Sequence, residues 1–172
     1  CSGSINVTAV MNALPVTNFS ATSVCQGATT AFTDGSSTTS GSISNWNWSF
    51  GDGANSTAQN PTHAYATAGT YNVSLTTTTT NGCTSTITRS VTVNPLPVAS
   101  FTGVDGCQGS NISFTNTSTV SSGFINTFAW TFGYGATSSS ANPTHTYATA
   151  GNYVVNLQVT TAGGCSANIN GN

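Results

Sequence analysis

Apolar and polar residues alternate with a period of two along several short stretches of the chain. Residues 71–75 read Tyr-Asn-Val-Ser-Leu, residues 46–50 read Trp-Asn-Trp-Ser-Phe, and residues 91–93 read Val-Thr-Val. Alternation of this kind places the apolar side chains on one face of a β-strand and the polar ones on the other. The stretches are separated by Gly, Asn and Pro, which favour turns. The pattern therefore predicts an all-β fold of short strands with one buried face.

The same pattern recurs at a fixed offset along the chain. Cys25 returns as Cys107, an offset of 82 residues (107 − 25). Further matches at this offset are Leu14-Pro15-Val16 with Leu96-Pro97-Val98, Asn60-Pro61-Thr62-His63 with Asn142-Pro143-Thr144-His145, and Tyr65-Ala66-Thr67-Ala68-Gly69 with Tyr147-Ala148-Thr149-Ala150-Gly151. A self-similarity this regular indicates a tandem repeat. About seven short strands in each copy predict two immunoglobulin-like β-sandwiches, 14–95 and 96–172, arranged as a rod.

Residues 1–13 fall in register with the end of a repeat. Cys1 lies 82 positions before Cys83, and Cys1-Ser2-x-x-Ile5-Asn6 matches Cys165-Ser166-x-x-Ile169-Asn170. We therefore interpret 1–13 as the closing strand of a preceding repeat, and we expect the start of one unit to complete the end of the unit before it. The alternative is that Cys1 is a mature, lipidated N-terminus.

Charge is nearly absent from this sequence. Asp34, Asp52, Asp105 and Arg89 are its charged side chains, and they make up 2% of 172 residues, where about 25% is typical of soluble proteins. Nucleic-acid binding and polybasic attraction to membranes, which both need clustered Lys and Arg, are excluded. The longest apolar run is too short to predict a membrane span. Thr and Ser, at 33 and 24 residues, supply much of the polar surface.

Few residues suggest catalysis or metal binding. His63 and His145 occur once per repeat, without a second His or carboxylate close in sequence. Zinc and calcium need three or more convergent ligands, so we expect each His to be hydrogen-bonded beside the Pro-containing turn. Asp52 is expected to bind turn amides. The sequence predicts no catalytic residue, no cofactor and no metal site.

A longer motif resembles a known family. Trp48-Ser49-Phe50-Gly51-Asp52-Gly53, a downstream His-x-Tyr and Gly-x-Tyr-x-Val-x-Leu resemble the PKD (polycystic kidney disease) domain, whose hallmark is W-D-F-G-D-G. The first Asp of that hallmark is Ser49 here and Thr131 in the second copy, and the second Asp is Tyr134 in the second copy. The hallmark positions are Trp48, Phe50, Gly51, Asp52, Gly53, His63, Tyr65 and Tyr71, then Trp130, Phe132, Gly133, Gly135, His145, Tyr147 and Tyr153.

The resemblance implies a fold, a compartment and a structural role for these residues. PKD domains are immunoglobulin-like sandwiches found in extracellular arrays and as accessory modules of secreted hydrolases. The tandem arrangement resembles arrays in large secreted or cell-surface bacterial proteins of the Bacteroidetes type. The Trp residues are expected in the core between the sheets, and the Gly residues at turn positions with positive φ.

Cysteine spacing is equal in the two repeats. Cys25 and Cys83 are 58 residues apart (83 − 25), and Cys107 and Cys165 are also 58 apart (165 − 107). This spacing predicts one disulfide inside each repeat, with Cys1 paired to a neighbouring unit. Buried free thiols or metal ligands are the alternative, although no Cys-x-x-Cys occurs. Disulfides would indicate an oxidising, extracellular compartment.

These features favour a structural function. The leading hypothesis is a repeat unit of an extracellular fibre or long surface adhesin, whose partners are neighbouring copies of itself. The alternative is an accessory module that binds glycans or other cell-surface proteins, for which Trp46, replaced by Phe128 in the second copy, is the candidate. Because an uncharged surface lacks charge repulsion between copies, we also expect glycosylation at surface Ser and Thr, at Asn55 and at Asn116.

Overall fold

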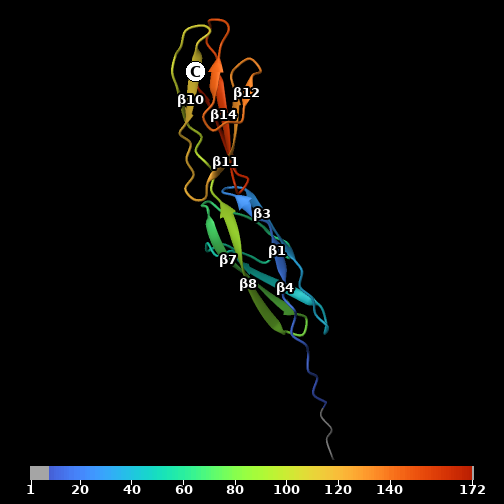
Figure 1. The fold of residues 1–172 in the computed structure, drawn as a ribbon. Helices are drawn as coiled ribbons and strands as arrows, with labels where there is room; N and C mark the ends of the chain where they lie inside the picture. Colours follow the sequence, from blue (N-terminus) through green and yellow to red (C-terminus); the bar gives the residue numbers. More distant parts are fainter. Residues whose placement is uncertain (1–7, 172) are drawn as a thin grey trace, which may run out of the picture. The chain divides into compact units, whose positions relative to one another are not determined.

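A computed structural model describes residues 8–171, which form fifteen strands and no helix (Figure 1). The strands of the first repeat are β1 (Phe19–Ala21), β2 (Val24–Cys25), β3 (Thr29–Asp34), β4 (Ile43–Ser49), β5 (Asn55–Ser56), β6 (Thr62–Ala64), β7 (Gly69–Thr79) and β8 (Thr84–Asn94). Those of the second are β9 (Phe101–Gly103), β10 (Asn111–Asn116), β11 (Ile125–Thr131), β12 (Thr137–Ser138), β13 (Thr144–Thr146), β14 (Val155–Thr161) and β15 (Ser166–Gly171). The all-β prediction is confirmed.

Two compact units divide the chain, and their limits do not coincide with the repeat limits. The first contains the residues through 23 together with 29–65 and 70–92, and the second contains 24–28, 66–69 and 93 onward. Three short segments of the first repeat therefore belong to the second unit: 24–28, which includes all of β2, 66–69, and 93–95 at its end.

The first unit has two sheets with a core of apolar side chains. One sheet has the order β1-β3-β6, and the other places β8, β7, β4 and β5 side by side. Trp48, Leu75 and Val73 are fully buried, each at 0% exposure, and they come from alternate positions of β4 and β7. Alternation along these strands thus directs one face into the core, as the sequence pattern predicts.

The second unit repeats this plan with the sheets β13-β10-β9 and β12-β11-β14-β15. Trp130 and Leu157 are the fully buried counterparts of Trp48 and Leu75, again at 0% exposure, and Val155, the counterpart of Val73, is 6% exposed. Phe128 packs against this core from the side and is only partly buried.

Strand limits match between the repeats at the 82-residue offset, with three differences. β14 begins four residues later in the repeat than β7, and β15 ends at Gly171 whereas β8 runs on to Asn94. β2, which pairs in parallel with the end of β8 (Val24↔Val93 and Cys25↔Asn94), has no counterpart strand in the second repeat. All three differences concern the part of the sheet formed by β2, the end of β8 and the start of β7.

The predicted closing strand at 1–13 lies partly outside the described residues, because the structure describes none of 1–7. Residues 8–13 belong to no strand. Val10 and Met11 are 76% and 93% exposed, although both are apolar.

Candidate functional site: a disulfide and two histidine clusters

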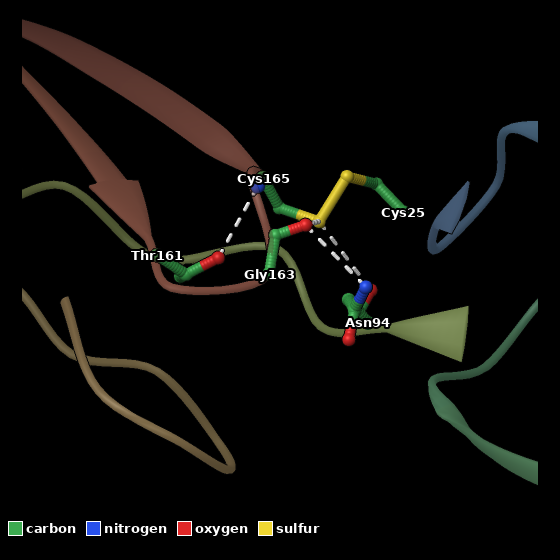
Figure 2. The surroundings of a disulfide bond; sticks show 5 residues. All are labelled: Cys25, Asn94, Thr161, Gly163 and Cys165. Carbon is green, nitrogen blue, oxygen red and sulfur yellow. Dashed lines mark hydrogen bonds between the residues drawn. A yellow bond between two sulfur atoms is a disulfide. The ribbon is translucent and has the colours of Figure 1, made fainter. Parts of the chain in front are cut away.

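One disulfide is present among the described residues, and it joins Cys25 to Cys165 (Figure 2). Both cysteines lie in the second unit, with Cα atoms 5.6 Å apart and a sequence separation of 140. Cys25 is placed by the parallel pairing of β2 with Asn94. The Cys165 amide donates a hydrogen bond to the Oγ1 of Thr161, at 3.2 Å, in the turn before β15.

Asn94 lies at the centre of this arrangement. Its carbonyl oxygen accepts a hydrogen bond of 2.8 Å from the Gln26 amide and lies 3.8 Å from the Sγ of Cys165. A disulfide sulfur carries no hydrogen, so the second distance describes a close contact and not a hydrogen bond. The end of β8 is therefore held between the two bonded cysteines.

The predicted pairs Cys25–Cys83 and Cys107–Cys165 are wrong in this structure. Cys25 lies opposite Asn94 at one end of β8, whereas Cys83 precedes Thr84 at the other end. Eleven residues of strand separate these ends by about 30 Å, far more than the 4.4–6.8 Å between Cα atoms that a disulfide spans. Equal spacing within each repeat could not reveal this, because a bond from one repeat to the next preserves the same periodicity.

Cys83 and Cys107 carry free thiols in the part of the chain that the structure describes. Cys83 has the local geometry of its bonded counterpart, Cys165. The Cys83 amide donates a hydrogen bond to Thr79 Oγ1 at 3.2 Å, and the Cys83 thiol donates one to the Asn12 carbonyl at 3.8 Å. Thr161 and Asn94 occupy the same positions around Cys165. Cys107 is exposed. The predicted bond of Cys1 to a neighbouring unit is not tested, because Cys1 lies outside the described residues.

The first hallmark cluster is a ladder of rings inside the first unit. Trp48 packs against Phe32 and Phe50, with ring centroids 5.6 Å and 6.5 Å away, and its Nε1 donates to the Ala58 carbonyl at 2.9 Å. His63 stacks on Phe50, with centroids 4.4 Å apart and planes within 6°. The buried Trp thus has its one polar atom satisfied, which favours a role in the core.

His63 also contacts a carboxylate that the sequence did not predict as its partner. Its Nε2 lies 2.7 Å from Oδ2 of Asp52, and the two side chains are 17% and 26% exposed. Asp52 accepts a bond from the Ala54 amide at 3.0 Å, as predicted. Burial acts to raise the pKa of Asp52, but the hydrogen bonds from His63 and Ala54 outweigh it and lower the pKa below its ordinary value.

Tyr134 replaces Asp52 in the second repeat and takes over its role. The Tyr134 hydroxyl lies 2.5 Å from Nε2 of His145, and His145 stacks on Phe132 with centroids 4.2 Å apart. The prediction that each His is hydrogen-bonded is confirmed. The sequence did not reveal the two partners, because each lies in the turn after β4 or β11 and contacts a His on a strand of the other sheet.

Two tyrosine rings stack on each other near each His. The ring centroids of Tyr65 and Tyr71 are 4.0 Å apart, and those of Tyr147 and Tyr153 are 4.1 Å apart. The Tyr65 hydroxyl donates to the Phe50 carbonyl at 3.0 Å. Burial, and then the charge of Asp52, raise the pKa of Tyr65 to about 12. Tyr65 is therefore a neutral packing group over the physiological range.

The turn glycines adopt the predicted backbone conformation. Gly51 and Gly53 have φ values of +83° and +96°, and Gly133 and Gly135 have +89° and +96°. A Cβ atom at Gly51 would lie 2.8 Å from the Asn72 carbonyl oxygen. This position therefore needs glycine for both its φ and its space.

Trp46, the candidate for glycan binding, is partly buried on β4. Its Nε1 donates to Oδ2 of Asp34 at 2.7 Å. Burial acts to raise the pKa of Asp34, but hydrogen bonds from Ser36, Trp46 and Gln59 outweigh it and lower the pKa. The indole N–H that a ligand would use is thus already bonded within the protein.

Groups of three or more His, Cys, Asp or Glu side chains that could hold a metal ion do not occur within residues 8–171. That same part of the chain has no helix of the length and apolarity needed to cross a membrane. Asn55 is exposed on β5, and Asn116 is half-buried with its Oδ1 bonded to the Ser118 amide at 3.1 Å. Glycosylation at these residues stays a prediction.

Comparison with protein families decides the relationship. A PKD domain model matches the chain twice, over residues 12–93 and 94–171. The chain belongs to the PKD domain family. Its repeats are therefore two tandem PKD domains with the immunoglobulin-like fold that the motif predicted.

Similar PKD sequences occur within much longer proteins. A microbial collagenase of Vibrio alginolyticus is 47% identical over 49 residues, which are 28% of this chain and 6% of the collagenase. Collagenase ColA of Bacillus cereus is 49% identical over 25% of this chain and 4% of its own length. The pre-pro-metalloprotease PrtV of Vibrio cholerae is 40% identical over 43% and 8%. The chain thus spans less than a tenth of each of these relatives.

Solved structures of PKD domains are also similar. The PKD1 domain of Vibrio anguillarum Epp is 35% identical with a TM-score of 0.45, covering 48% of this chain and 96% of that domain. The PKD1 domain of the Vibrio cholerae PrtV is 33% identical with a TM-score of 0.44, covering 47% and 98%.

Proposed function

We propose that this chain is a non-catalytic structural repeat unit of an extracellular fibre or long bacterial surface adhesin, in which PKD domains follow one another in a rod. The observation that carries the proposal is the disulfide between Cys25 of the first repeat and Cys165 of the second. A bond from one repeat to the next joins successive PKD domains covalently beyond their peptide linker. That linker contains Pro95 and Pro97, which restrict its backbone further.

The disulfide also supports an extracellular location, because structural disulfides persist in oxidising compartments. The near-absence of charge supports a structural role. An assembly with four charged side chains per 172 residues depends little on electrostatic interactions, and these are the interactions that salt screens. PKD domains within the collagenases and PrtV are consistent with a module of secreted proteins.

Electron microscopy of the native material tests the proposal. We expect thin unbranched fibres or stalks that persist in molar salt. Particles of discrete size, with no fibre or stalk on the cell surface, would contradict it. Saturable binding of the chain to a glycan, abolished by Trp46→Ala and retained by the matched Phe128→Ala, would favour the accessory-module alternative instead.

A further inference from the structure

The Cys25–Cys165 disulfide closes a loop that contains most of the chain. Its cysteines are 140 positions apart, and every strand from β3 to β14 lies between them. The buried indoles of the two repeats, Trp48 and Trp130, are inside the loop as well. Of the strands that the structure describes, β1 and β15 lie outside the loop, and β2 ends at its bond. One covalent ring therefore encloses most of both folded repeats.

A pulling force on a chain is transmitted along its shortest covalent path. When the force acts on points before Cys25 and after Cys165, this path crosses the S–S bond and leaves out residues 26–164. The two Cα atoms are 5.6 Å apart, and a disulfide holds them within about 4.4–6.8 Å. The enclosed strands therefore cannot be drawn out lengthwise while the bond is intact.

The lengths on the two sides of the bond are very different. A fully extended chain spans about 3.3–3.6 Å per residue, so the 140 positions between the bonded cysteines store about 460–500 Å. From Leu14 to Cys25 and from Cys165 to Gly171 there are 11 and 6 positions (25 − 14 and 171 − 165). These two stretches yield about 60 Å together. The bond thus withholds roughly eight times the length that they can release.

We propose that the Cys25–Cys165 disulfide is the tension-bearing link of this chain, and that it makes the two PKD domains an inextensible tether whose length is released by reduction. The inference rests on the proposed function, because a fibre or surface stalk is the setting in which the chain is pulled. It adds a mechanical role to that function. The folded domains give the unit its shape and surface, and the disulfide transmits the tension.

The strands outside the loop are the part that yields under tension. β1 pairs with β3 along Phe19–Ala21, and β15 pairs with β14 along Ser166–Gly171. Both pairings are antiparallel ladders of hydrogen bonds. Tension can strip these strands from their neighbours, because hydrogen bonds separate at far lower force than covalent bonds. Stripping stops at the disulfide, since β2 ends at Cys25 and β15 begins directly after Cys165.

The fold shields this bond from reductants (Figure 2). Cys165 is 1% exposed, and its Sγ lies 3.8 Å from the Asn94 carbonyl oxygen and 4.0 Å from that of Gly163. Cys25 is half-buried on β2, which pairs with the end of β8. A reducing thiolate must reach one of the two sulfurs, so it attacks at Cys25. We therefore expect slow reduction while the domains are folded.

Reduction of the bond is a two-step exchange. A thiolate of dithiothreitol attacks Cys25 Sγ and forms a mixed disulfide, and the Cys165 thiolate leaves and takes up a proton. The second sulfur of dithiothreitol then displaces Cys25 and closes a cyclic disulfide. The reductant loses two electrons in total, and two cysteine thiols remain in the chain.

Single-molecule stretching tests the path of the tension. The chain is held by tags fused to its two ends and carries Cys1→Ser, Cys83→Ser and Cys107→Ser, so Cys25 and Cys165 are its remaining cysteines. We expect the oxidised chain to show no extension step longer than about 60 Å. Oxidised chains that release several hundred ångströms as their domains unfold would overturn the proposal.

The matched control adds Cys25→Ser and Cys165→Ser to the same background. Its domains then lie in the path of the force, and we expect unfolding steps that together release several hundred ångströms. Dithiothreitol added to the bonded chain under constant force should convert its behaviour to that of the control, after one reduction event per molecule. Equal extension of the bonded chain before and after reduction would show that the bond does not transmit the tension.

Native material separates this inference from the proposed function. Oxidised fibres should resist stretching, and the same fibres should extend several-fold further after reduction. Fibres that extend equally in both states would leave the proposed function standing and overturn the tension-bearing bond. Isolated chains that release their length only on reduction, from a source that has no fibre or stalk, would support the path of the tension and overturn the proposed function.

Discussion

His63 and His145 occupy equivalent positions in the two repeats, yet they hydrogen-bond to different partners. His63 is paired with the carboxylate of Asp52 at 2.7 Å, and His145 with the hydroxyl of Tyr134 at 2.5 Å. The stacking of each imidazole on the preceding Phe hardly differs, with centroids 4.4 Å and 4.2 Å apart. The fold therefore needs a hydrogen-bonded ring at this position, and it accepts either a charged or a neutral partner.

The same exchange occurs at a second position. Asp34 and Asn116 are repeat equivalents, and each binds the amide two residues later through Oδ1, at 3.0 Å and 3.1 Å. The first repeat thus uses two carboxylates where the second uses an amide and a phenol. The two repeats have similar contacts at these positions but differ in charge. Comparing their stabilities therefore separates the contribution of packing from that of electrostatics.

The largest effects should come from the shared packing and should be equal in the two repeats. Trp48→Ala and Trp130→Ala each remove a fully buried indole and its hydrogen bond to a carbonyl, at a cost of about 3–5 kcal/mol. Urea unfolding followed by the backbone amide signals of residues in each unit measures the two units separately. A loss in one repeat more than twice that in the other would contradict equivalence of the cores.

The bonded and the free cysteine pairs should contribute unequally to stability. Cys25→Ser with Cys165→Ser opens a loop of 140 residues and should lower the free energy of unfolding by about 2–5 kcal/mol. The matched control, Cys83→Ser with Cys107→Ser, removes two free thiols at equivalent positions and should cost less than about 0.5 kcal/mol in the monomer. Similar losses in both double variants, measured by urea unfolding without reductant, would show that the bonded pair has been assigned wrongly.

Much of the fold was predictable because it depends on local patterns. Alternation in 46–50 and 71–75 determined which face is buried, and the Gly-x-Gly turns required positive φ. The disulfide was not predictable in the same way. Cys25 meets Cys165 only because β2 pairs with the end of β8, and a spacing of 58 within each repeat is compatible with bonds inside or between repeats. The partners of His63 and His145 likewise depend on where a turn meets a strand in space.

Within the hallmark turn, two glycines with similar φ should respond differently to the same change. Gly51→Ala and Gly53→Ala both force a side chain into positive φ, which costs about 1–2 kcal/mol. Gly51→Ala should cost more, because its Cβ would lie 2.8 Å from the Asn72 carbonyl oxygen, whereas Gly53 faces open space. Thermal unfolding of the two variants gives the order. If Gly53→Ala were the more destabilising, the close approach of the backbone at Gly51 would not be limiting.

Acid should destabilise the first unit and leave the second unit less affected. Hydrogen bonds lower the pKa of Asp34 and of Asp52 in the folded state, so folding favours their charged forms. Their contribution is present above the ordinary carboxyl pKa of 3.8 and is lost as the pH falls through the lowered values. The second repeat has no carboxylate at either position, because Asn116 stands in place of Asp34 and Tyr134 in place of Asp52.

We expect this contribution to be about 1 kcal/mol or less, because both carboxylates are partly exposed to solvent. It appears as a fall in the unfolding temperature of the first unit between pH 5 and pH 2, followed through the indole signals of Trp48 and Trp130. The double variant Asp34→Asn and Asp52→Asn should remove most of the fall, and Asn116→Asp should introduce one in the second unit. An equal loss of stability in the two wild-type units over this range would show that the carboxylates of Asp34 and Asp52 do not stabilise the first unit.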